Sequence, residues 1–122
     1  MAEDFKKLKI WQKAHELMLH VYKLTNSFPK EESFSLTSQI RRAALSVSAN
    51  IAEAQGRYHD AETIHFIYNA RGSAEEVRSH LAASVDLAYI SKKEFDKLEE
   101  EYLGLIKGIN SFIRAIKHKG LN

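Results

Sequence analysis

Residues 35–57, SLTSQIRRAALSVSANIAEAQGR, predict a helix with two different faces. At about 100° per residue, one face collects small and aliphatic side chains, namely Leu36, Ile40, Ala43, Val47, Ile51 and Ala54. The other face carries a polar ladder, namely Gln39, Arg42, Ser46, Asn50, Glu53 and Arg57. Small apolar side chains let a neighbouring helix approach closely. The polar ladder either meets polar partners on another helix or subunit, or faces water.

Three more segments have the apolar spacing of amphipathic helices. Residues 8–25 repeat apolar positions every three or four residues, and residues 60–90 do the same over a longer stretch. The fourth segment begins at Ser91-Lys92-Lys93-Glu94, whose S-x-x-E spacing is that of a capping box, and we expect it to end at Gly120. Four such segments with short connections predict an all-α, antiparallel up-down-up-down four-helix bundle, in one domain over residues 1–122.

Local signals place the predicted helix ends. Ser35 is a suitable N-cap for the second helix and Asp60 for the third. Gly56 suits the left-handed conformation that often closes a helix. Around the only proline of the chain, Phe28 and Phe34 are expected to plug one end of the core.

Glycines inside the predicted helices suggest close contacts between helices. Gly72 lies within the third segment, at a cost of about 1 kcal/mol relative to alanine. We therefore expect a close helix contact or a slight bend there. Gly104 and Gly108 are four apart on one face and would allow another helix to pack against the backbone, although such pairs are often incidental in a protein of this class.

Composition excludes several classes of protein. Cysteine is absent, which rules out disulfides and thiolate chemistry. The charged N-terminus is unlike a secretory signal, and no apolar run approaches the ~20 residues of a membrane span. A cytoplasmic protein without membrane contact is the simplest expectation.

A metal-dependent enzyme is the second class considered. Glu62-x-x-His65 has the E-x-x-H spacing of carboxylate-bridged metal bundles. A di-metal site needs two such elements and further inward carboxylates, whereas Glu62 falls in a first helical turn, where acidic residues are already favoured. No nucleophile elbow or phosphate-binding glycine loop is present. The sequence predicts no enzyme, no metal site and no cofactor.

Basic residues gather near both termini. The chain has 18 Lys plus Arg and 16 Asp plus Glu, for a net charge of +2. An even number of antiparallel helices brings the two terminal clusters to one end of a bundle. Their members are Lys6, Lys7, Lys9 and Lys13, and Arg114, Lys117 and Lys119. They form a candidate nucleic-acid-binding patch, although solvated lysines near termini are the simpler explanation.

A series of ordered motifs resembles one known family. They are Trp11-Gln12-Lys13-Ala14, Phe28-Pro29-Lys30-Glu31-Glu32, Leu36-Thr37-Ser38-Gln39-Ile40-Arg41-Arg42-Ala43-Ala44, Ser48-Ala49-Asn50-Ile51-Ala52-Glu53 and Arg71-Gly72-Ser73-Ala74-Glu75-Glu76. In this order they resemble the 23S rRNA-intervening-sequence proteins over nearly the whole chain. One departure is Ala54-Gln55-Gly56-Arg57, where the family usually has Gly-Tyr-Gly-Arg.

The resemblance implies small bundles that assemble into five-subunit rings and carry no enzymatic activity or cofactor. It extends more distantly to the accessory protein of diversity-generating retroelements, which works beside a reverse transcriptase and binds nucleic acid. By this resemblance we expect a homopentamer, and a ring would multiply any basic patch.

The polar ladder has two interpretations. It forms a network within or between subunits, or it binds a polyanion or a partner. The candidate residues are Gln39, Arg42, Asn50, Glu53, Arg57, Glu75 and Glu76. Within this set, Arg42 is expected to pair with Glu75 or Glu76.

Two functions remain open at this point. The first is a non-enzymatic oligomer that binds RNA or DNA through the terminal lysines and arginines. The second is a protein-binding adaptor without nucleic-acid contact. An exposed patch containing Tyr22, Tyr58 or Tyr68 would favour the adaptor.

Overall fold

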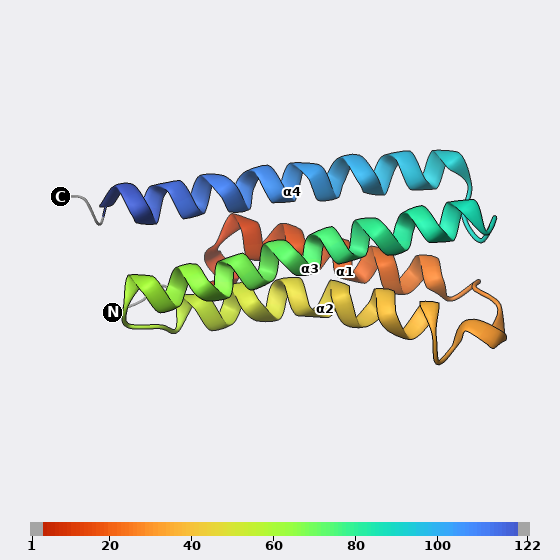
Figure 1. The fold of residues 1–122 in the computed structure, drawn as a ribbon, viewed down its shortest axis with the longest axis horizontal. Coiled ribbons are helices and arrows are strands. Elements are labelled where there is room, and N and C mark those ends of the chain that lie inside the picture. The colour runs from red at the N-terminus through yellow and green to blue at the C-terminus, as the bar shows by residue number, and fades with distance from the viewer. Residues whose placement is uncertain (1–3, 120–122) are drawn as a thin grey trace.

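The computed structural model describes residues 4–119, and within this range the long elements are four helices. They are α1 (Lys9–Thr25), α2 (Leu36–Gln55), α3 (Asp60–Asp86) and α4 (Lys92–Lys119), with short 3₁₀ turns η1 (Phe5–Lys7) and η2 (Lys30–Glu32). Successive helices run in opposite directions, as the sequence predicts (Figure 1). The turn between α2 and α3 lies at the same end of the bundle as the end of α4 (Figure 1).

One apolar core runs along the bundle axis. The predicted stripes supply it, and side chains with no exposed surface come from every helix, including Leu17, Ile40, Ile67 and Ile109. Tyr102 of α4 is also completely buried, and its hydroxyl has no hydrogen-bond partner among the described residues. Such a group loses its hydration without compensation.

The start of α2 is capped by a different residue from the one predicted. Ser35 occupies the N-cap position, but its side chain does not bond the helix backbone. Instead, Oε1 of Glu32 accepts hydrogen bonds from the Ser35 hydroxyl at 2.7 Å and from the Leu36 amide at 3.3 Å. These bonds, together with one from Tyr89, lower the pKa of Glu32. The prediction missed Glu32 because η2 brings it back over the helix end.

The turn between α2 and α3 also corrects two predictions. Gly56 does end α2, but with φ −84°, which is not left-handed, so no glycine-specific conformation is used there. The N-cap of α3 is His59, and Asp60 is already the first residue of the helix. A carboxylate at that position still interacts favourably with the helix dipole.

The third helix is shorter than predicted and the fourth begins as predicted. α3 ends at Asp86, four residues before the predicted end, because Ala88 turns the chain with φ 63°. The Tyr89 amide then bonds the Ser84 carbonyl at 2.9 Å, as in a Schellman motif. The capping box is confirmed, since the Ser91 amide bonds Glu94 Oε1 at 2.9 Å and the Glu94 amide bonds Ser91 Oγ at 3.1 Å. The predicted end of α4 at Gly120 lies outside the described residues.

The two phenylalanines near the proline behave differently. Phe28 is 8% exposed and packs on Tyr89, with ring centroids 5.4 Å apart. Phe34 is 98% exposed, so the expectation that it plugs the core is wrong. Tyr89 also donates a hydrogen bond of 2.8 Å to Glu32, which ties the α3–α4 connection to the α1–α2 connection.

Among the glycines inside the described helices, only Gly108 lies against another helix. A Cβ added at Gly108 would come within 3.2 Å of Cγ2 of Ile10, so α1 and α4 approach closely there. A Cβ at Gly72 or Gly104 would meet nothing within 4 Å, so a close contact does not explain either residue. None of the described helices is long and apolar enough to cross a membrane.

Candidate functional site

The terminal basic residues lie along two helices that meet near Gly108. Lys9 and Lys13 flank the contact between Ile10 and Gly108, and Lys6 and Lys7 precede them in η1. Arg114, Lys117 and Lys119 lie further along α4, toward its C-terminal end. Six of these seven side chains are exposed and Lys13 is half-buried, with Glu101 at 3.6 Å and Glu16 at 3.9 Å.

A basic cluster surrounds Tyr68, on the side of the bundle formed by α3 and α4. The Lys117 ammonium donates a hydrogen bond of 2.8 Å to the Tyr68 hydroxyl and lowers the pKa of Tyr68. The Arg71 guanidinium lies 4.8 Å from the centre of the Tyr68 ring and bonds Asn110 Oδ1 at 2.8 Å. The phenol is therefore enclosed by two cations on an accessible surface, where Tyr68 remains 37% exposed.

The acidic residues are unevenly distributed along α4. From residue 102 to residue 119 the helix contains Lys107, Arg114, Lys117 and Lys119 and no acidic residue. Residues 5–15 and 63–74, near the start of α1 and in α3, also lack acidic side chains. The sequence pattern predicted a role for the terminal basic residues and named Tyr68 as part of a possible protein-binding patch, but it did not group Tyr68 with Arg71, Asn110 and Lys117. The long acid-free runs are the signal that could have pointed to this side.

The polar ladder of α2 is partly a network and partly exposed. Asn50 donates hydrogen bonds to the Ser46 carbonyl at 2.8 Å and to its hydroxyl at 3.0 Å, and Ser46 in turn bonds Ser73 of α3 at 2.8 Å. Arg57 pairs with Glu53. Gln39 and Arg42 are exposed.

The predicted pairing of Arg42 with Glu75 or Glu76 is wrong. Arg42 makes no hydrogen bond or ion pair with any described residue. Glu75 instead bonds Arg78 at 2.6 Å, and Glu76 lies 3.6 Å from His80. The prediction placed the α2 ladder toward Glu75 and Glu76, whereas Glu75 shares Arg78 with Glu99 of α4 and Glu76 lies against His80 of α3.

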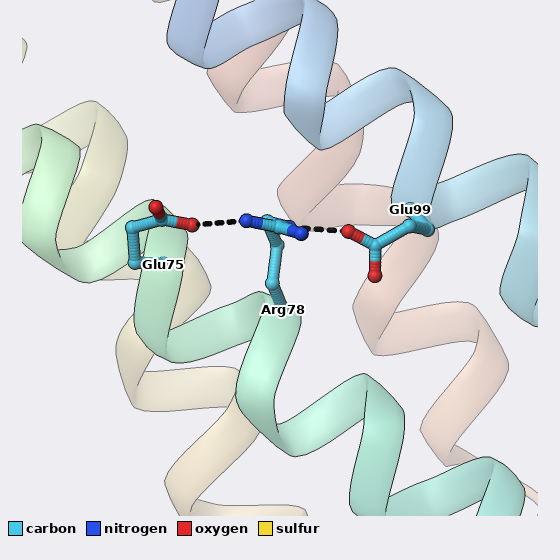
Figure 2. Close-up of polar contacts among 3 residues, drawn as sticks. All are labelled: Glu75, Arg78 and Glu99. Atoms are coloured by element: carbon cyan, nitrogen blue, oxygen red, sulfur yellow. Dashed lines mark hydrogen bonds and ion pairs between the residues drawn. The ribbon is translucent and has the colours of Figure 1, made fainter.

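Arg78 of α3 bonds two carboxylates, one on its own helix and one on α4. Figure 2 shows its guanidinium between Glu75, one turn earlier on α3, and Glu99 of α4. The hydrogen bond to Glu99 raises the pKa of Arg78 most, and the bond to Glu75 raises it further. Only 20% of the Glu99 side chain is exposed, so Arg78 compensates a carboxylate that is largely removed from water.

The E-x-x-H element forms no metal centre within the described chain. Glu62 and His65 are both exposed, and His65 contacts the Phe66 ring. No group of three histidine or acidic side chains among residues 4–119 could hold a metal ion. The described surface therefore offers charged and aromatic binding groups rather than an arrangement for metal chemistry.

Comparison with solved structures identifies the same fold elsewhere. A crystal structure of a protein with unknown function from the S23 ribosomal protein family of Bacteroides thetaiotaomicron VPI-5482 superposes with a TM-score of 0.77. The match covers 85% of this chain and 97% of that one, at 23% sequence identity. At this identity the likeness establishes the fold alone. No curated protein matches the chain.

Sequence comparison identifies the family. The model of the 23S rRNA-intervening sequence protein family matches residues 6–111, from η1 through most of α4. This range includes all the motifs that carry the resemblance noted from the sequence. The chain therefore belongs to the 23S rRNA-intervening sequence protein family.

Proposed function

We propose that this chain is a non-enzymatic bundle that forms a homo-oligomeric ring, a pentamer by its family resemblance, and binds RNA or other nucleic acid. The observation that carries the proposal is the long acid-free half of α4, residues 102–119. Its Lys117 meets Arg71 of α3 around the accessible ring of Tyr68. Cationic side chains beside an aromatic ring suit a phosphate backbone with unstacked bases.

The mechanism is electrostatic. Each lysine or arginine that neutralises a phosphate releases condensed counterions, so binding weakens steeply with salt. One chain carries a net charge of only +2, but a ring repeats the same patch and allows several contacts to act together. The described residues include no base-reading module, so this mode of binding has low sequence specificity.

A protein-binding adaptor is the second candidate. Tyr58 supports it, because this aromatic side chain is 92% exposed at the turn between α2 and α3. Tyr22 gives no such support, since it is half-buried against the core and its ring also contacts the Arg41 guanidinium. Tyr68 lies among cations, which favours a polyanion over a neutral protein surface.

The test combines mass measurement with RNA titration. Gel filtration with light scattering first gives the oligomer mass, which we expect to be a multiple of 14.0 kDa. Labelled generic RNA is then titrated at about 50 and about 200 mM salt. With about six phosphate contacts, we expect the affinity to fall by about a hundredfold or more between these conditions. An oligomer that does not bind RNA at low salt would contradict nucleic-acid binding and favour the protein-binding adaptor. A monomer would contradict the proposed ring.

A further inference from the structure

The outward side of α2 carries an exposed stripe that the fold does not use. Arg42, Leu45, Ala49 and Glu53 follow one another at helical spacing, and all four are exposed. Leu45 is 44% exposed, and Arg42 makes no hydrogen bond or ion pair within the described part of the chain. This α2 stripe therefore presents an unpaired cation beside an aliphatic side chain.

A matching stripe lies on the outward side of α4. Glu100, Leu103, Gly104 and Lys107 are exposed at the same spacing. Leu103 is 39% exposed, and neither Glu100 nor Lys107 has a polar partner among residues 4–119. The surface above Gly104 is open, because a Cβ added there would meet nothing within 4 Å. This α4 stripe presents an unpaired anion beside an aliphatic side chain.

We propose that the α2 stripe of one subunit packs against the α4 stripe of a second copy of this chain. In this contact Arg42 faces Glu100 of the partner subunit, and Leu45 faces Leu103 of the partner subunit. The inference rests on the self-association proposed above and specifies the surfaces that carry it.

The register of the two stripes supports the pairing. When the helices are aligned in parallel, Arg42 pairs with Glu100 and, three residues later, Leu45 pairs with Leu103. The next position sets Ser46 against the open surface of Gly104.

The topology of the bundle allows this contact to close into a ring. α2 and α4 lie diagonally across the bundle, since each packs against α1 and α3 and their backbones do not approach one another closely. In the up-down-up-down arrangement they run in the same direction (Figure 1). Rotation about an axis along the bundle keeps every copy in that direction, so α2 meets the next α4 in parallel. Two different surfaces joined head to tail generate rings when the rotation closes.

Two exposed apolar residues extend the same contact. Phe34, just before α2, is 98% exposed, and Leu87, the C-cap of α3, is 53% exposed. Both lie at the end of the bundle where α2 and α4 begin (Figure 1). The parallel register brings that end of one copy against the same end of the next, which would cover both side chains.

An antiparallel contact between two α2 helices is the competing arrangement. It would place Arg42 opposite Glu53, because these residues lie on one face three turns apart. Glu53 is already paired with Arg57, which disfavours this alternative. The two arrangements can be distinguished by experiment, because only the contact between α2 and α4 requires Glu100.

The experiment is a charge swap read by light scattering. Arg42→Glu and Glu100→Arg are each expected to lower the oligomer mass toward 14.0 kDa, while Arg42→Glu/Glu100→Arg together restore it. Leu45→Ser should lower the mass as well. Leu19→Ser is its matched control, because Leu19 is 55% exposed on α1, outside both stripes. Circular dichroism verifies that each variant keeps its helices.

Each failure has a distinct meaning. A wild-type monomer would overturn self-association itself, and this contact with it. An oligomeric wild type with unchanged single variants would overturn the contact alone. A lower oligomer mass with Arg42→Glu but not with Glu100→Arg would point to the antiparallel α2 pair. If the double variant Arg42→Glu/Glu100→Arg folds but stays dissociated, the pairing of Arg42 with Glu100 is refuted.

Discussion

The two halves of α4 use charge in opposite ways. Residues 92–101 carry both signs, and four of these charges form ion pairs among the described residues: Lys92 with Asp96, Glu99 with Arg78, and Glu101 with Lys13. Residues 102–119 carry only positive charge, and the hydrogen bonds that their basic side chains make with described residues are those from Lys117 to Tyr68 and from Arg114 to Ser111. Charges matched inside the chain hold helices together, whereas charges of one sign on a surface are available to a polyanion.

The largest effect is expected where the matched half of α4 is broken. Arg78→Met leaves Glu99 without its cation in a site where it is only 20% exposed. We expect a loss of about 2 kcal/mol in the free energy of unfolding, since a poorly hydrated carboxylate loses its compensation. Urea denaturation measures the change.

Arg114→Met is the matched control for Arg78→Met. Arg114 is exposed, and among the described residues it bonds only Ser111. Its replacement should alter stability by no more than about 0.5 kcal/mol. Equal losses in the two variants would remove the distinction between the halves of α4.

Tyr102 stands at the boundary of the two halves, and its replacement should stabilise the bundle. The buried hydroxyl has no partner within residues 4–119, so Tyr102→Phe removes an uncompensated polar group while keeping the ring. We expect a gain of about 1 kcal/mol by urea denaturation. Tyr89→Phe is the contrasting control and should be destabilising, because the Tyr89 hydroxyl bonds Glu32 at 2.8 Å.

The buried phenol of Tyr102 predicts that the bundle loses stability at alkaline pH. Burial raises the pKa of Tyr102, and the nearby Glu101 charge raises it further. In the unfolded chain the phenol loses its proton near about pH 10, but in the folded chain it keeps the proton. Stability is therefore full below about pH 10 and falls above it. Thermal melts from about pH 8 to about pH 11 should show a smaller decline in Tyr102→Phe than in the wild type.

A smaller gain is expected at the turn that leads into α4. Ala88 adopts φ 63°, a conformation that costs an alanine about 1–2 kcal/mol. Ala88→Gly should remove most of this strain, and after the entropy cost of glycine a gain of about 0.5–1 kcal/mol remains. Ala82→Gly, at an exposed position within α3, should lose about 1 kcal/mol. If Ala88→Gly and Ala82→Gly lower the free energy of unfolding by similar amounts, the turn at Ala88 is not strained.

Features that depend on near neighbours in the chain could be predicted from the sequence. The apolar stripes predicted the four helices, and the capping box at Ser91 and Glu94 is present as predicted. Both signals are contained within one or two turns. The short connections then left few ways to arrange four amphipathic helices.

Features that depend on how the helices rotate could not be predicted. The partner of Glu75 is Arg78 rather than Arg42, because Glu75 lies on the side of α3 where Arg78 also reaches Glu99 of α4. Glu32 caps α2 only because η2 folds back over Ser35. The Tyr68 cluster joins residues 49 positions apart, and no local pattern specifies that contact.

The most direct test of the difference between the halves of α4 is a matched charge reversal. Arg114→Glu/Lys117→Glu and Lys93→Glu/Lys97→Glu change the net charge equally, but at opposite ends of the helix. RNA affinity at about 50 mM salt is measured for both variants. We predict that the first variant binds at least about tenfold more weakly and that its salt slope falls by about 1–2, while the second stays close to the wild type. Equal weakening in both variants would contradict a localised site.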